Sequence, residues 1–258
     1  MNVEVANALG RIVELKDRST AAHTWRVSMY AQAVAEAAGV DTARVMNFMK
    51  GAVLHDLGKL DVPDEILAKP GPLDPDEYRR MQRHTVAGWE RLRRLGETEP
   101  LILDVVRSHH ERIDGSGYPD GLAGEQIPRA ARWFAVIDGF DAMTSLRPYR
   151  DDVGEEAASH AIVELQSKAG SWYEPEAVEV FGNLFDAGRL DSILEHLNDR
   201  QGQASLVGPL SPEVLELARD ALQRSAPADE PPDRVDRLLS FARAEATGET
   251  PPVGKDLA

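Results

Sequence analysis

The stretch DTARVMNFMKGAVLHDLGK, residues 41–59, joins a helical pattern directly to a histidine–aspartate pair. Asp41 is a good N-cap, and the pattern predicts a helix over residues 41–58. His55 continues the apolar stripe, so this helix should carry an imidazole into the protein core. The stripe has the three-to-four-residue period of one helix face, and it consists of Val45, Phe48 and Ala52.

The same period extends over most of the first 190 residues, and no alternating stretch is long enough to predict a strand. We therefore expect an all-α fold, a helical bundle. Asp74, followed by Pro75 and Glu77, has the pattern of a capping-box helix start. Further helices are predicted at residues 20–38, 100–112, 128–145, 153–169 and 175–187.

The composition changes after residue 198. The segment NDRQGQASLVGPLSP, residues 198–212, is polar and rich in turn formers, which indicates a linker. Two short helices are predicted at 211–223 and 233–246, followed by a disordered end. The chain should thus consist of a main domain, 1–198, and an appendage, 199–258. Helices this short cannot form a core alone, so they should pack on the main domain, on a second copy as a homodimer, or on a regulatory protein.

Charge and composition exclude several classes of protein. The net charge is −15, which argues against a broad surface for DNA or anionic lipid. A small phosphorylated ligand remains compatible, because a metal ion can override a negative surface locally. No apolar run of about 18 residues predicts a membrane span, and the N-terminus lacks a signal-peptide core, so we expect a cytoplasmic protein. With no cysteine, any metal must be held by nitrogen and oxygen.

Several polar residues fall on the apolar helix faces. Each alone could be an ordinary hydrogen-bonded core residue. Burying all of them without partners would cost several kcal/mol each, which favours a shared metal site. Imidazole and carboxylate without thiolate favour Fe, Mn, Co, Ni or Zn over Ca. The residues are His23, His55, His84, His109, His110 and Asp138, and Asp56 beside His55 could bridge two ions.

Five motifs, in order, resemble the HD-GYP family of phosphohydrolases. HDLGK at 55–59 and HHERIDGSGYP at 109–119 contain the residues that name the family. DGFDAMTSLRPYR at 138–150 resembles its last motif, KDRSTAAHTWRV at 16–27 its first histidine motif, and HTVAG at 84–88 its third. The resemblance covers roughly residues 10–185.

The resemblance implies an HD-type helical fold with two or three metal ions that hydrolyses cyclic di-GMP to pGpG and sometimes on to GMP. Lys59 would contact the scissile phosphate, and Lys59 and Asp56 would be the catalytic residues. Substrate would also contact Gly117, Tyr118, Pro119, Arg147 and Arg150. The implied metal ligands are His23, His55, Asp56, His84, His109, His110 and Asp138.

One position departs from the family pattern. Three-metal members carry a glutamate four residues before the first histidine, where this chain has Ser19. We therefore predict two divalent ions in preference to three, with Fe or Mn favoured and Co, Ni or Zn as alternatives. His160 and His196 belong to no motif and are expected to be structural or surface residues.

Two alternative functions stay open. The first is an HD-type phosphohydrolase of another nucleotide, against which the complete GYP motif argues. The second is a weakly active module that senses cyclic dinucleotides, against which the intact ligand set and Lys59 argue.

Overall fold

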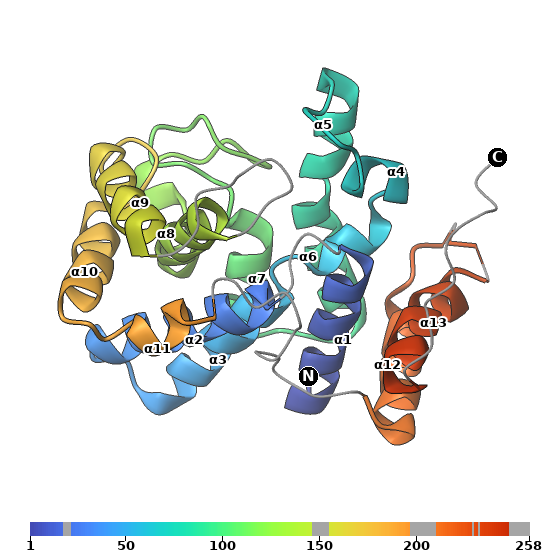
Figure 1. Ribbon diagram of the computed structural model, residues 1–258. Helices are drawn as coiled ribbons and strands as arrows, with labels where there is room; N and C mark the ends of the chain where they lie inside the picture. The colour runs from blue at the N-terminus through green and yellow to red at the C-terminus, as the bar shows by residue number, and fades with distance from the viewer. Residues whose placement is uncertain (18–21, 146–154, 197–209, 229, 232, 248–258) are drawn as a thin grey trace.

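The computed structural model describes residues 1–17, 22–145, 155–196, 210–228, 230–231 and 233–247 (Figure 1). Helices and turns make up this part of the chain, and its only β-structure is two isolated bridges. The all-α prediction is confirmed. No helix in the described ranges is long and apolar enough to cross a membrane. The first half contains α1 (Val3–Lys16), α2 (His23–Ala37), α3 (Thr42–Leu54), η2 (Leu57–Asp61), α4 (Asp64–Leu67), α5 (Pro75–Gln82), α6 (His84–Arg94) and α7 (Pro100–Ser108).

The second half begins with the loop that carries the GYP sequence and the short η3 (Gly124–Gln126). Four helices of the main domain follow, and two more form the C-terminal pair. They are α8 (Arg129–Thr144), α9 (Glu155–Ser167), α10 (Pro175–Asp186), α11 (Asp191–Leu194), α12 (Pro212–Ser225) and α13 (Arg234–Thr247).

Two hydrophobic clusters meet at the centrally placed helices α3 and α7. These helices approach closely, because a side chain at Gly51 would begin only 3.2 Å from Val105. One face of the pair packs with α2, α8, α9 and α10 into the first cluster, which includes Phe134 and Phe181. The opposite faces pack with α1, η2, α6 and the C-terminal pair into the second cluster. The C-terminal ends of α3 and α7 therefore lie where both cores can support them.

Both central helices end earlier than the sequence predicts. The helix expected to reach residue 58 stops at Leu54, with His55 as its C-cap. The helix expected to reach residue 112 stops at Ser108, with His109 as its C-cap. At a helix end the backbone leaves the helical path, so the side chains of adjacent residues can point toward the same site. This explains how His55 with Asp56, and His109 with His110, can converge.

A close contact between backbones explains the early end of α3. After Asp56 the chain tightens into η2, which packs directly on α6. A Cβ added at Gly58 would lie 1.8 Å from the His84 carbonyl oxygen and 2.5 Å from the Gly88 nitrogen. No side chain fits there, so glycine is what allows η2 to lie against α6.

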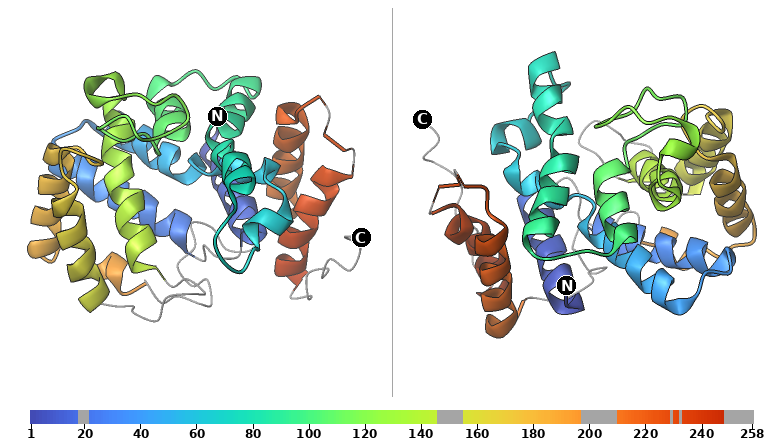
Figure 2. Two further views of the ribbon diagram at one scale, coloured as in Figure 1. Left: turned by 90° about the horizontal axis from the view of Figure 1, so that it is seen from above. Right: turned by 180° about the vertical axis from the view of Figure 1, so that it is seen from behind.

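The C-terminal pair packs on the same chain. Figure 1 and the right-hand view of Figure 2 show α12 and α13 beside α1, with which both are in contact. Their apolar faces enter the second cluster through Ala218, Leu222 and Leu239, each fully buried. Of the three partners left open by the sequence, the main domain is the one observed. A homodimer or regulatory protein at residues 200–258 stays a prediction, as does the division at residue 198; the linker residues 199–209 and the end, 248–258, lie outside the described residues.

The Gly58 contact generates a stability test. Gly58→Ala should lower the free energy of unfolding by about 1–3 kcal/mol or more, because the methyl group overlaps α6 backbone atoms. Gly182→Ala is the matched control: its Cβ would meet only the Gln166 amide at 3.8 Å, so stability should stay equal or rise by up to about 1 kcal/mol. Urea unfolding followed by circular dichroism measures both. Equal stability of the two variants would contradict the proposed contact.

Candidate metal centre

Helix ends place the five predicted histidines around one buried site. His23 and His84 begin α2 and α6, His55 and His109 cap α3 and α7, and His110 follows directly. Four of the rings are almost completely buried, with residue exposures of 2–6%. These four are His23, His55, His84 and His109.

The Nδ1 atoms of three rings point outward to backbone carbonyls. A neutral imidazole that donates from Nδ1 keeps a lone pair on Nε2, so these rings present acceptors to the interior. The distances are 2.7 Å from His55 to the Ala52 oxygen, 2.8 Å from His84 to the Met81 oxygen, and 3.0 Å from His109 to the Val105 oxygen.

His23 is oriented by a carboxylate instead. Its Nδ1 lies 2.7 Å from an Asp141 oxygen, which also accepts from the buried Arg26 guanidinium at 3.0 Å. Burial alone would raise the pKa of Asp141, but the charges of Arg26 and His23 hold it well below its usual range. An ionised partner at Nδ1 leaves the His23 Nε2 lone pair facing inward, an arrangement common behind metal-bound histidines.

The inward nitrogens face one another in pairs. His23 Nε2 lies 3.2 Å from His55 Nε2, and His84 Nε2 lies 3.3 Å from His109 Nε2. Since the other nitrogen of each ring is engaged as a donor, the two lone pairs in each pair would repel. A cation between or beside the rings removes this conflict, so the donor set fits divalent metal ions.

Two carboxylates complete the cluster. The two oxygens of Asp56 lie 3.2 Å from His55 Nε2 and 3.4 Å from His84 Nε2. One Asp138 oxygen lies 3.7 Å from His23 Nε2 and 3.9 Å from His55 Nε2. Asp56 therefore stands between the two pairs of rings, and Asp138 faces one of them.

All seven predicted ligands fall into three overlapping groups whose donor atoms lie within 4.8 Å of one another. Two of these groups have no residue in common, and the third shares one histidine with each of them. The groups are His84 with His109 and His110; His23 with His55 and Asp138; and His55 with Asp56 and His109. The convergence that the motifs predict is present in the structure.

Burial keeps most of these rings in the neutral form that binds metal. It lowers the pKa of His84 and, more strongly, that of His109, and it lowers the pKa of His110 to about 3 with help from the neighbouring His84. Burial acts in the same direction on His55, but the adjacent Asp56 carboxylate outweighs it and raises the pKa of His55.

Lys59 lies at the edge of the cluster between two carboxylates. Its Nζ is 2.8 Å from Asp56 and 2.8 Å from Asp17, which caps α1. Burial would lower the pKa of Lys59, yet these two carboxylates raise it above its usual value. The residue is therefore a fixed positive charge beside the donor set.

The GYP loop folds back against the end of α7. A Cβ at Gly117 would lie 2.4–2.5 Å from backbone atoms of residues 110–112, so only glycine fits. Tyr118 donates its amide to the His110 carbonyl at 3.2 Å, and the two ring centroids are 4.7 Å apart. Pro119 follows through a cis peptide bond. The loop thus places Tyr118 directly beside a predicted ligand.

Sequence reasoning missed three supporting residues. Asp141 lies three positions after Asp138, and that helical spacing was the available signal. Asp17 has no signal at the sequence level, because it meets Lys59 from another helix. Glu111 holds the GYP loop by accepting the Asp120 and Leu122 amides.

Arg147, Arg150 and Ser19 lie outside the described residues. His160 is exposed, and His196 stacks on Trp25 at 4.8 Å, away from the cluster.

Comparison with known proteins identifies relatives that match about 70% of the chain. A cyclic di-GMP phosphodiesterase of Thermotoga maritima is 40% identical over 184 residues, covering 70% of this chain and 49% of the relative. A 3′3′-cGAMP-specific phosphodiesterase 2 of Vibrio cholerae is 36% identical over 184 residues, covering 71% of this chain and 35% of the relative. The chain thus spans about half or less of the length of these relatives.

A solved structure shares the fold. The crystal structure of a cyclic GMP-AMP-specific phosphodiesterase of Vibrio cholerae superimposes with a TM-score of 0.63 at 16% identity, covering 95% of this chain and 70% of the other. The model of the HD domain family matches residues 7–177, the region that contains all seven clustered donors. The chain therefore belongs to the HD domain family and carries the motifs of its HD-GYP branch.

Proposed function

We propose that the chain is a metal-dependent phosphodiesterase that hydrolyses cyclic di-GMP to pGpG, with GMP as a further product. The observation that carries this proposal is the convergence of seven nitrogen and oxygen donors beside Lys59. The names of the relatives support cyclic dinucleotides as the substrate class.

We infer two divalent ions, one near each of the two separate donor groups. Asp56 would bridge them, since each of its oxygens faces a different group. The donor chemistry favours Fe or Mn, with Co, Ni or Zn as alternatives. When bound, the ions would supply Lewis-acid stabilisation of the scissile phosphate and activate the attacking water.

The protein groups have separate tasks in this proposal. Lys59 neutralises charge that develops on the phosphoryl oxygens, and Asp17 keeps its ammonium in place. Asp141 holds His23 in the tautomer that presents Nε2. Tyr118, positioned by Gly117 and Pro119, forms a wall for a base of the substrate. Arg147 and Arg150 are proposed to bind phosphate or a guanine edge.

A second substrate is favoured by one comparison. The Vibrio cholerae relative named for 3′3′-cGAMP is 36% identical to this chain. Measuring kcat/KM for both cyclic dinucleotides on the metal-loaded protein decides between them. We expect the higher kcat/KM with cyclic di-GMP. A higher kcat/KM with 3′3′-cGAMP would make that compound the proposed substrate. If the metal-loaded protein hydrolyses neither compound, the proposed function is refuted.

The Asp56→Ala variant tests the bridging role. It should retain the helical fold yet lose bound metal and lower hydrolysis by about 100-fold or more, because Asp56 faces both donor groups. Metal analysis, circular dichroism and a hydrolysis assay measure the three effects. Asp220→Ala on α12, an exposed carboxylate paired with Arg224, is the control and should behave as wild type. Near-normal turnover by metal-loaded Asp56→Ala would rule out the role.

The Lys59→Ala variant separates chemistry from metal binding. Turnover should fall by about 100-fold or more, while metal content falls far less, because Lys59 supplies charge to the phosphate and no donor to an ion. Lys69→Ala, which removes a more exposed lysine paired with Glu77, should leave both unchanged. Parallel loss of metal and activity in Lys59→Ala would make the residue a structural support instead.

A further inference from the structure

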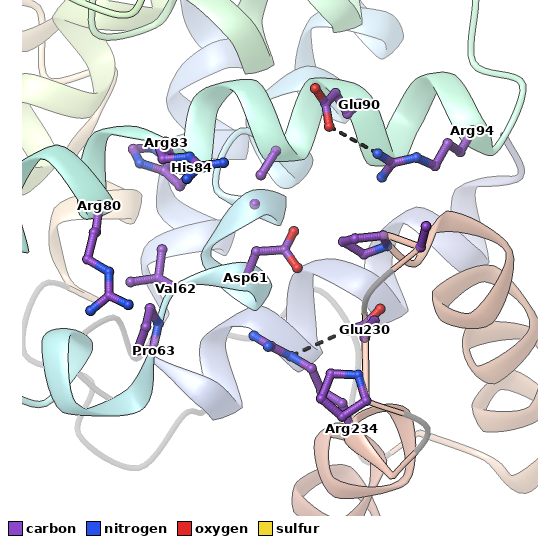
Figure 3. Close-up of a pocket in the computed structure, with 15 residues that line it drawn as sticks. Asp61, Val62, Pro63, Arg80, Arg83, His84, Glu90, Arg94, Glu230 and Arg234 are labelled. Atoms are coloured by element: carbon purple, nitrogen blue, oxygen red, sulfur yellow. Dashed lines mark hydrogen bonds and ion pairs between the residues drawn. The ribbon is translucent and has the colours of Figure 1, made fainter.

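A cavity of about 490 Å³ opens between α6, η2 and the residues that lead from α12 to α13 (Figure 3). Of the seven clustered donors, His84 alone lines it, so the cavity is a place separate from the metal centre. Three parts of the chain form its walls, and the C-terminal pair supplies one of them through Pro227, Glu230 and Arg234.

Four arginines and three carboxylates line the cavity. The buried Arg91 guanidinium, behind the wall, donates to both oxygens of Asp61 at 2.6 and 2.8 Å and to Glu230 at 3.1 Å. Arg234 lies 3.3 Å from the same Glu230. These two carboxylates are therefore already neutralised by arginines of the protein.

The third carboxylate is also engaged. Glu90 pairs with Arg94 at 3.0 Å, at the same end of the cavity as Glu230. At the opposite end lie Arg80 and Arg83 (Figure 3). Both are exposed, and neither pairs with a carboxylate among the residues the structure describes. Two uncompensated guanidinium groups thus face one end of a cavity in a chain of net charge −15.

We propose that this cavity binds a phosphorylated small molecule of nucleotide size, with its phosphate on Arg80 and Arg83. Guanidinium groups bind phosphate through paired, charge-assisted hydrogen bonds. The volume lies in the range of small-ligand sites, and it exceeds what a phosphate alone would fill. Val62, Pro63, Ala87 and Pro227 provide apolar wall for the rest of the ligand.

The position of the cavity gives the ligand a structural effect. Asp61 ends η2, which carries Lys59, and Val62 follows it; Pro227 lies in the segment that joins α12 to α13. A ligand in contact with both sides would hold the C-terminal pair against the main domain. Binding to the folded form alone also raises the thermal midpoint as ligand concentration rises.

The test compares two matched double variants of the full-length, metal-loaded protein. Arg80→Ala/Arg83→Ala removes both cavity arginines. Arg79→Ala/Arg93→Ala removes one exposed arginine from α5 and one from α6, neither of which lines the cavity, so the net charge changes equally. Isothermal titration with AMP, and with adenosine as the ligand lacking phosphate, gives the dissociation constants and the number of sites.

We expect wild type and Arg79→Ala/Arg93→Ala to bind AMP at one site. In Arg80→Ala/Arg83→Ala this site should be absent or should bind AMP at least about tenfold more weakly. Adenosine should bind far more weakly to all three proteins. The same site should persist in Asp56→Ala, which separates it from the metal centre. Hydrolysis of cyclic di-GMP by Arg80→Ala/Arg83→Ala should stay at the wild-type level.

Three results would overturn the proposal. They are the absence of AMP binding by wild type, equal weakening in the two double variants, and loss of all AMP binding in Asp56→Ala. Should a variant fail to fold, a crystal structure of wild type with AMP decides: electron density for the phosphate beside Arg80 and Arg83 supports the site, and density only at the metal centre refutes it. None of these results bears on the proposed hydrolysis.

Discussion

The structure depends on a conflict between buried imidazole lone pairs. Three rings donate from Nδ1 to backbone carbonyl oxygens three or four residues earlier in the chain, and a fourth donates to Asp141. All four therefore direct lone pairs at one another across 3.2–3.3 Å. Between buried neutral rings this repulsion costs free energy. A divalent cation turns the same arrangement into coordination. The helix ends around the cluster are therefore built for an ion.

Two short-range constraints bring those helix ends together. Gly58 lets η2 lie on the backbone of α6, which moves His84 next to Asp56. Gly117 lets the GYP loop fold under the end of α7, which places Tyr118 against His110. At both positions the absence of a side chain permits a close contact between backbones. The residues proposed to bind metal or substrate lie one to three positions away in the sequence.

The sequence allowed most of the longer helices and the convergence of the seven donors to be predicted, because apolar periodicity and motif spacing are local signals; α1 and the separate helix α6 were missed. The ends of α3 and α7 were predicted four residues too late. Their true ends depend on tertiary contacts of Gly58 and of the GYP loop, which no local pattern encodes. The Asp17–Lys59 pair likewise joins separate helices. Helices α12 and α13 pack on α1 because their apolar faces complete the second hydrophobic cluster. That cluster is assembled from distant parts of the chain, so the sequence alone left three possible partners for the two helices.

The site lies where the two hydrophobic clusters meet, with donors from α2 and α8 on one side and from α6 on the other. Ions held there would act as additional cross-links between two halves of the protein whose hydrophobic clusters meet at α3 and α7. Neither half could then unfold without breaking coordination bonds, so bound ions should slow the unfolding of both halves together. The metal-loaded protein would then unfold as one cooperative unit, although its hydrophobic core is divided into two clusters.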